Sequence, residues 1–230
     1  MAEQSRKQDM GSGSIPRLML NLAIPAVVAQ LINMLYNIVD RIYIGHIPDA
    51  GASALTGVGL FLPILMMINA FAMLAGSGGA PRAAIAMGKK DLESARKILG
   101  NCFSLLMIFS VMLTVLFYLF APQLLRLFGA SDVTLPYALS YARIYILGIV
   151  FVMIVMGLNP FITTQGFAKF SMLTTVVGAV CNIILDPILI FGLGMGVRGA
   201  AIATVISQAV SAVWVLCFLR GSRTILKLSL

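Results

Sequence analysis

Two aspartates lie inside long apolar stretches of this sequence, where an acidic side chain is unusual. Asp40 follows Asn37-Ile-Val, and Asp186 stands in Asn182-Ile-Ile-Leu-Asp-Pro. If these stretches cross a membrane, each acid costs roughly 2.5–3.5 kcal/mol on insertion scales, and such residues are functional by default. The chemistry that intramembrane acids serve is the binding and transfer of protons or small cations.

The two acids are predicted to lie at one depth. Asp40 comes five residues, and Asp186 six, before the glycine that ends each apolar stretch, and Thr204 lies five residues into the returning stretch. Asn182 is four residues before Asp186, so both share one helical face. Carboxylate, carboxamide and hydroxyl oxygens suit Na⁺ or a proton relay. We therefore expect a site for H⁺ or Na⁺ formed by Asp40, Asn182, Asp186 and Thr204.

Polar residues recur at helical spacing on three stretches. The first stripe comprises Gln30, Asn33, Asn37 and Asp40, and the last comprises Thr204, Ser207, Gln208 and Ser211. Stripes that cannot favourably face lipid are expected to turn toward one internal hydrated cavity. Two alternatives stay open. Hydroxyls on membrane helices often bond only to backbone, and Asp40 could pair with Arg41 at the interface.

Composition identifies the elements that must carry these residues. Of 230 residues, 60% are hydrophobic and 10% are charged, and the mean hydropathy is +1.01. A soluble domain carries about 25% charged residues, so a soluble enzyme is excluded. Since one span takes about 20 apolar residues, the sequence predicts an all-α integral membrane protein. We expect a tail over 1–16, a lobe of six transmembrane helices over 17–220 (spans at about 17–45, 53–79, 98–120, 137–158, 168–191 and 199–219) and a linker over 221–230.

The net charge of +8 indicates topology, because Lys and Arg are retained on the cytoplasmic side. With both termini inside, the inner loops hold twelve basic residues, against four outside (Arg41, Arg126, Arg143 and Arg198). The basic residues do not cluster as a nucleic-acid surface would, so no nucleic-acid partner is expected. We predict a multi-pass protein of a cell membrane, and of a bacterial inner membrane in particular, in contact with anionic lipid.

Enzymatic readings are weaker. Two intramembrane aspartates could form an aspartyl-protease dyad, but neither stands in a Tyr-Asp or Gly-x-Gly-Asp motif. Gly194–Gly199 matches the dinucleotide fingerprint formally, yet no acid follows Asp186 to bind a ribose. Glycines at a tight interhelical turn explain the match more simply. The three cysteines lie in apolar spans without metal or redox spacing, and no cofactor is expected.

Three segments carry a resemblance to a known family. They are Pro25…Asn37-Ile-Val-Asp40…Gly45, the run from Asn182 through Asp186-Pro-Ile-Leu-Ile-Phe-Gly-Leu-Gly-Met-Gly-Val-Arg-Gly to Thr204, and Gly88-Lys-Lys-Asp-Leu-Glu-Ser-Ala-Arg96. Together they resemble multidrug and toxic compound extrusion (MATE) transporters of the MOP superfamily, over residues 17–220. The resemblance implies an antiporter that exports amphipathic, often cationic drugs in exchange for H⁺ or Na⁺. It places the cation site on Asp40, Asn182, Asp186 and Thr204.

The resemblance also implies a hinge and a substrate cavity. A proline removes a backbone hydrogen bond, so Pro25 would be the hinge at which the first span bends when the acid site fills. Candidate cavity residues are Gln30, Asn33, Tyr36, Asn37 and Asn159. A lipid-linked oligosaccharide flippase of the same superfamily would need basic residues in the cavity, and a channel or structural subunit is a further alternative.

The chain has half of the expected spans. The family has twelve in two lobes, whereas six are predicted here, so one wall of an alternating-access cavity is missing. We expect an N-terminal half that needs a C-terminal lobe, or a half-transporter that forms a homodimer. The same oxygen ligands serve Na⁺ and H⁺, so the sequence does not choose between them.

Overall fold

The computed structural model describes residues 15–48, 50–221 and 224–228. Within these ranges the chain is almost entirely helical and has no strand. In order, the elements are α1 (Ile15–Gly45), α2 (Gly51–Gly59), α3 (Leu62–Gly88), α4 (Leu92–Leu127), α5 (Leu135–Leu147), α6 (Ile149–Thr164), α7 (Ala168–Pro187), the π-helical turn η1 (Ile188–Gly192) and α8 (Val197–Arg220). The prediction of an all-α fold is confirmed.

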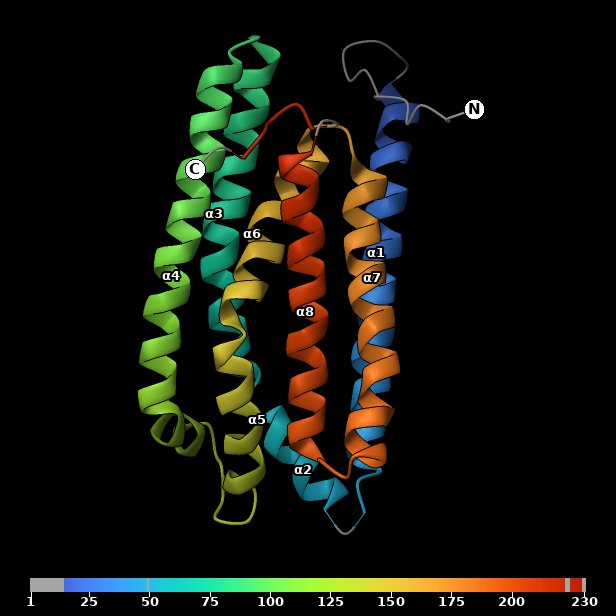
Figure 1. Cartoon of the computed structure of the whole chain (residues 1–230), viewed down its shortest axis with the longest axis vertical. Helices are drawn as coiled ribbons and strands as arrows, with labels where there is room; N and C mark the ends of the chain where they lie inside the picture. Colours follow the sequence, from blue (N-terminus) through green and yellow to red (C-terminus); the bar gives the residue numbers. More distant parts are fainter. Residues whose placement is uncertain (1–14, 49, 222–223, 229–230) are drawn as a thin grey trace.

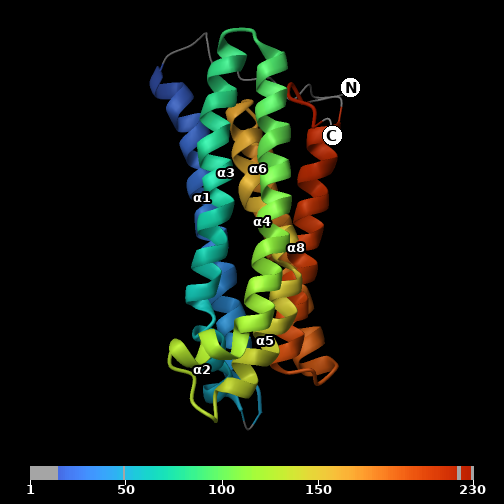
Figure 2. The same ribbon diagram turned by 90° about the vertical axis from the view of Figure 1, so that its left-hand side faces the viewer.

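The long helices run side by side as an elongated bundle (Figures 1 and 2). The start of α1, the α3–α4 turn and the end of α8 lie at one end, which we call the α3–α4 end. The short helix α2 and most of α5 lie at the other, which we call the α2 end. Since α1 starts and α8 finishes at the same end, the chain crosses the length of the bundle an even number of times.

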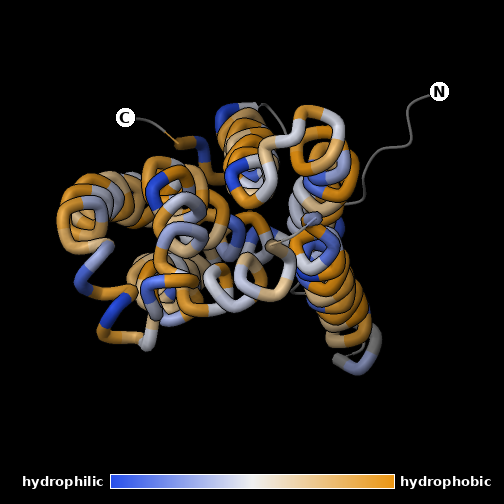
Figure 3. Tube along the Cα trace, turned by 90° about the horizontal axis from the view of Figure 1, so that it is seen from below, coloured by the Kyte–Doolittle hydropathy of each residue, from blue (hydrophilic) through white to orange (hydrophobic). Residues whose placement is uncertain are grey.

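Among the described residues, five segments are long and apolar enough to cross a membrane: Met19–Gly45, Gly51–Gly88, Leu92–Leu127, Ala168–Gly192 and Val197–Arg220. The pair α5 and α6 adds a sixth if it crosses as one broken span. Seen from the α2 end and coloured by hydropathy, the helices are mostly apolar (Figure 3). Large apolar side chains such as Met66, Val111 and Leu119 are exposed, as expected where lipid replaces water. The prediction of an integral membrane fold is confirmed.

The fourth span is bent, which the sequence analysis did not anticipate. The axes of α5 and α6 differ by 58°, and Gly148 stands at the break between them. A Cβ added to Gly148 would lie 2.6 Å from a methyl group of Val205 on α8. The glycine therefore lets the break approach α8, where any larger residue would collide.

Helices α3 and α4 both extend beyond the predicted spans, which were placed at 53–79 and 98–120. Only a short turn, between Gly88 and Leu92, joins them. The Asp91 side chain caps α4 by accepting a hydrogen bond from the Ser94 backbone N–H at 3.0 Å. In the first turn of α4, Glu93 pairs with Lys97 at 2.7 Å. Caps and i,i+4 ion pairs stabilise helix in contact with water. The polar residues between the predicted spans therefore belong largely to helix, and α4 begins at Leu92.

The glycine-rich turn before α8 has a structural explanation. Gly194 and Gly196 adopt φ of +64° and +54°, a left-handed conformation that favours glycine. A Cβ on Gly199 would lie 2.7 Å from the carbonyl carbon of Leu189. These glycines serve a tight turn and close packing. This agrees with the prediction that the glycine-rich segment is an interhelical turn and not a dinucleotide-binding motif.

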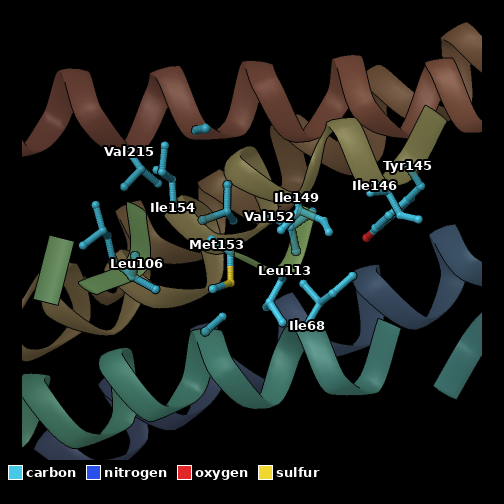
Figure 4. Packing of buried hydrophobic residues seen from close by; sticks show 14 of the residues in the cluster. Ile68, Leu106, Leu113, Tyr145, Ile146, Ile149, Val152, Met153, Ile154 and Val215 are labelled. Carbon is cyan, nitrogen blue, oxygen red and sulfur yellow. The ribbon is translucent and has the colours of Figure 1, made fainter. Parts of the chain in front are cut away.

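The apolar core lies where α3, α4, α6 and α8 meet (Figure 4). Ile68, Leu106 and Met153 are 0% exposed and come from three different helices. Because lipid is as apolar as these side chains, close van der Waals contact, and not escape from water, stabilises such a core. Helix α1 joins this core through Ile44 near its end, and most of its length packs along α7, as Figure 1 shows. Polar residues on α1 and α7 can therefore face a separate, less tightly packed region.

Candidate functional site

Three of the predicted ion-site residues form one hydrogen-bonded group. Asn182 and Asp186 lie one turn apart on α7, and Thr204 lies on the neighbouring helix α8. The Asn182 amide nitrogen donates to an oxygen of Asp186 at 3.3 Å and to the hydroxyl oxygen of Thr204 at 3.4 Å. The Thr204 hydroxyl donates in turn to the carbonyl of Ala200 at 2.9 Å. All three side chains are at most 3% exposed.

Asp40 joins this group from α1. Asp40 is 9% exposed, and its carboxyl group lies next to the Asp186 carboxyl group. Because α1 packs along α7, the two acids meet although 146 positions separate them in the sequence. The structure thus brings together Asp40, Asn182, Asp186 and Thr204, which we call the acid cluster.

The acid cluster has buried oxygens that nothing in the described part of the chain satisfies. One carboxylate oxygen each of Asp40 and Asp186, and the amide oxygen of Asn182, are buried without a hydrogen-bond donor. A buried polar atom without a partner costs about 1–3 kcal/mol, and more when charged. Three such acceptors in one place are the arrangement that a proton or a small cation would satisfy.

The chemistry of these oxygens favours a hard ion. Within the described residues there is no group of three or more His, Cys, Asp or Glu able to hold a metal ion. The acid cluster offers two carboxylates, one amide and one hydroxyl, and no nitrogen or sulfur ligand. Oxygen ligands of this kind suit hard cations and not zinc or copper. Na⁺ or H⁺ therefore fits the cluster, and a transition metal does not.

A cavity of about 570 Å³ opens beside the acid cluster; we call it the central cavity. Its walls come from α1, α3, α6, α7 and α8, and both Asn182 and Thr204 line it. Four of the predicted cavity residues also line it: Gln30, Asn33, Tyr36 and Asn159. Apolar side chains, including Met73 and Met156, complete the wall, and no Lys or Arg is among its lining residues. The cavity is mixed in polarity and carries no positive charge.

Asn37 does not line the central cavity. It lies with Asp40 and Arg41 at a smaller cavity of about 170 Å³, which we call the acid cavity. The Asn37 amide donates to the backbone carbonyl of Asn33 at 2.6 Å, so it is engaged by its own helix. Tyr36 lines both cavities. The structure therefore divides the predicted α1 stripe between two cavities that share Tyr36 in their walls.

Two further residues of the acid cavity escaped the sequence analysis. Tyr141 and Tyr145 on α5 line it with Phe61, and their rings stack at 5.8 Å. Tyr141 also lies next to the hydroxyl of Thr204. Their signal was present as tyrosines at i and i+4, four residues after Tyr137. The spacing alone does not indicate a site, because aromatic residues on a membrane helix are usually packing residues.

The sequence left two alternatives open: that the hydroxyls bond only to backbone, and that Asp40 pairs with Arg41. The structure supports the first for two residues and not the second. Ser207 donates to its own helix at Ala203 over 2.7 Å, and Ser211 donates to the Thr174 carbonyl of α7 at 3.3 Å. Both α8 hydroxyls therefore bond to backbone carbonyls, in agreement with the alternative that such hydroxyls serve helix packing. Arg41 lines the acid cavity but forms no ion pair with Asp40, because the ion pairs within the described ranges are Lys97–Glu93 and Arg126–Asp132.

Pro25 is buried inside α1, which continues as one helix on both sides of it. A proline at this position removes the hydrogen bond that its N–H would donate one turn back. The local helix is therefore weakened where a hinge was expected. Bending at Pro25 stays a prediction.

Gln165 anchors the chain beyond α8 to the turn after α6. Its side-chain oxygen accepts from the Thr224 hydroxyl at 2.7 Å and from the backbone N–H groups of Ile225 and Leu226 at 2.8 and 2.9 Å. Its amide nitrogen donates to the Phe161 carbonyl at 3.0 Å. The described part of the predicted linker, 224–228, thus packs onto the bundle.

Replacing Gln165 with Leu is expected to release this segment. Two backbone N–H groups would lose their acceptor, at about 1–3 kcal/mol for each buried group. Amide hydrogen exchange at Ile225 and Leu226 should accelerate roughly 10- to 100-fold. Gln123→Leu, on the exposed surface of α4, is the matched control and should change neither amide. Unchanged exchange in the Gln165 variant would contradict the anchoring role.

The fold and the acid cluster together define a class: a polytopic membrane protein that encloses a mixed-polarity cavity beside buried acids, as ion-coupled transporters do. The family model MatE matches residues 25–188. This chain belongs to the MatE family, and its resemblance to MATE transporters is confirmed. Because the members of this family are transporters, the prediction that the chain is not an enzyme is also confirmed.

Several relatives agree over most of the chain. Multidrug export protein MepA of Staphylococcus haemolyticus is 30% identical over 213 residues, covering 92% of this chain and 47% of that protein. A FAD transporter of Shewanella oneidensis is 26% identical over 204 residues, covering 87% and 44%. The outward-facing structure of a multidrug resistance MATE family transporter of the MOP superfamily is 31% identical and covers 95% of this chain and 48% of that one, with a TM-score of 0.87.

The chain spans about half the length of the curated relatives it matches. It also covers about half of each similar solved structure, as one lobe of a two-lobed transporter would. The predicted fold class, six transmembrane helices forming one lobe of a MATE-type transporter, is confirmed at this level.

Proposed function

We propose that this chain forms the N-terminal half of an antiporter that exports amphipathic, cationic compounds in exchange for H⁺ or Na⁺. The observation that carries the proposal is the group of three unsatisfied buried oxygens at the acid cluster. They stand beside a cavity large enough for a small organic molecule. The similarity to multidrug export protein MepA also supports a role in the export of such compounds.

Coupling follows from walls that the two sites share. Asn182 and Thr204 belong to the acid cluster and also line the central cavity. Tyr36 lines both the central cavity and the acid cavity. An ion that reorients Asn182 therefore changes the wall against which a substrate packs. By linkage, a substrate that prefers one arrangement changes the affinity for the ion by the same factor.

The lining of the central cavity favours cations over anions. Its lining residues include no Lys or Arg, and two acids lie next to it. An anionic substrate such as a nucleotide-like cofactor or a lipid-linked sugar phosphate would meet no basic partner there. Arg41 is the basic residue at the acid cavity, outside the central cavity. A flippase, or the FAD transport of the Shewanella relative, is therefore the less favoured alternative for this chain.

A second lobe is required to close the central cavity during transport. Many apolar side chains on α1, including Val27, Leu31 and Met34, are exposed in the described lobe. We expect either a C-terminal lobe of a longer chain or a second copy of this chain opposite it. The mass of the purified protein in mild detergent distinguishes the two, since a transporting two-copy assembly of the 230-residue chain would exclude the need for a longer one.

The cellular setting follows from the charges. Within the described ranges, the basic residues of the α3–α4 end and its loops are Arg17, Arg82, Lys89, Lys90, Arg96, Lys97, Lys169, Arg220 and Lys227. By the positive-inside rule this end faces the cytoplasm. We place the protein in a bacterial inner membrane with both termini in the cytoplasm.

The test is transport by the full-length protein in proteoliposomes. A fluorescent lipophilic cation should move only when a gradient is imposed, and separate Na⁺ and pH gradients identify the coupling ion. Movement without any gradient dependence would indicate a channel, and movement of a lipid-linked oligosaccharide but not the cation would indicate a flippase. Either result would contradict the proposal.

A further inference from the structure

A second large cavity lies away from the acid cluster, between α3 and α4 near the turn that joins them. It has a volume of about 800 Å³ and shares no lining residue with the central cavity. The two helices lie side by side along its length (Figure 2). We call this cavity the α3–α4 groove.

The outer part of the α3–α4 groove is positively charged. Arg82, Lys89 and Lys97 line it, and Asp91 is its one acidic lining residue. The hydrogen bond from Ser94 lowers the pKa of Asp91, so this carboxylate is charged at neutral pH and is occupied in capping α4. Lys97 is paired with Glu93. Within the described residues, neither Arg82 nor Lys89 forms an ion pair; Asp91 lies near Lys89 but is held by its cap, so both cations are available to an anion.

The inner part of the groove is apolar. Gly78 and Leu74 lie one and two turns deeper along α3 than Arg82, which is about 12 Å at 1.5 Å per residue. Leu105 of α4 faces them, and Leu74 is 61% exposed. A Cβ added to Gly78 meets no atom within 4 Å, so the groove has open space at this point. Charge at the mouth and apolar space below it match the layout of a phospholipid.

We propose that the α3–α4 groove binds an anionic phospholipid, with its phosphate between Arg82 and Lys89 and an acyl chain along Gly78 and Leu74. Basic pockets between membrane helices on the cytoplasmic side bind such head groups. Long Lys and Arg side chains reach to the interface while their stems cover apolar surface. A free phosphate would use the charged mouth alone and would leave the apolar part of the groove empty. The binding of lipid is independent of the transport proposed above.

The experiment measures lipid binding by native mass spectrometry and by thermal stability of the full-length protein in mild detergent. Phosphatidylglycerol should bind and raise the melting temperature, whereas phosphatidylcholine should not. A Lys or Arg near the surface contributes about 1 kcal/mol to such attraction. Losing both charges in Arg82→Gln/Lys89→Gln should therefore weaken binding about 30-fold.

A matched pair removes the same charge outside the groove. Lys90 and Arg96 lie in the same turn region and do not line the groove. Lys90→Gln/Arg96→Gln should retain most of the phosphatidylglycerol effect. An equal loss in both pairs would show diffuse surface attraction and overturn the proposal, as would equal binding of phosphatidylcholine.

A further variant tests the apolar part without changing charge. Gly78→Leu should fill the open space, abolish the phosphatidylglycerol effect and leave the lipid-free melting temperature unchanged or higher. It also keeps the test decisive if the charge variants fold poorly. Unchanged lipid binding in Gly78→Leu, or an equal stability gain from inorganic phosphate, would overturn the lipid assignment.

Discussion

Replacing Asp186 with Asn is expected to abolish ion-driven transport while leaving the fold intact. The change keeps the size of the side chain but removes a buried carboxylate that lies beside Asp40 and has one oxygen without a hydrogen-bond donor. Even changes behind the ligands of an ion site cost about 10- to 100-fold in affinity. Loss of a ligand itself should cost at least roughly 100-fold. Asp40→Asn is expected to behave in the same way.

The measurement combines transport with ion-dependent stability. In the native protein the coupling ion should raise the melting temperature, because it binds the folded state. In either Asn variant this ion effect should vanish. The melting temperature without ion should stay the same or rise, because two adjacent buried carboxyls become one. Asp132→Asn is the matched control, since Asp132 is an exposed acid at the α2 end. Intact coupling in both site variants would show that the ion binds elsewhere.

Replacing Gly76 with Val is expected to disrupt the contact between α3 and α6. A Cβ at Gly76 would lie 2.8 Å from the carbonyl oxygen of Gly157 and 3.2 Å from its Cα. Since the obstacle is backbone, a rotamer change cannot relieve it, and the helices must separate. Overpacking of this kind costs about 1–3 kcal/mol. In a chain of this size that corresponds to a melting temperature roughly 2–12 °C lower.

Gly78→Val is the matched control on the same helix. Gly78 is two residues from Gly76, yet a Cβ there meets nothing within 4 Å. The same substitution should therefore leave the melting temperature in lipid-free detergent nearly unchanged. Thermal unfolding in detergent, followed by size-exclusion chromatography, gives the comparison directly. Similar losses in both variants would show that helix propensity, and not the α3–α6 contact, sets the cost.

The acid cluster was predictable from sequence to an unusual degree. An acid in an apolar run is conspicuous, and its distance from the end of the run sets its depth, because each helical residue rises by about 1.5 Å. Asp40, Asp186 and Thr204 could be placed at one level in this way. Asn182 followed from its position one turn before Asp186. The structure brings these four residues together.

Other residues of the site could not be found in that way. Tyr141 reaches the acid cavity only because α5 bends from α6 by 58°, and nothing in a hydropathy profile shows that break. Asn37 was assigned to the substrate cavity by its stripe, but its amide is engaged by the Asn33 carbonyl. Gln165 gained its role from residues 224–226, which are some sixty positions away. Each case depends on which segment packs against which.

Composition and spacing alone establish an all-helical membrane lobe with a buried oxygen cluster. The reason is that a backbone in lipid must satisfy its own hydrogen bonds, so an apolar run of sufficient length has to be a helix. Which helices become neighbours depends on close contacts such as Gly76 against Gly157 and Gly148 against Val205. These contacts depend on shape and not on polarity, so the division of the predicted cavity into two, the bend in the fourth span and the α3–α4 groove are features that only the folded chain reveals.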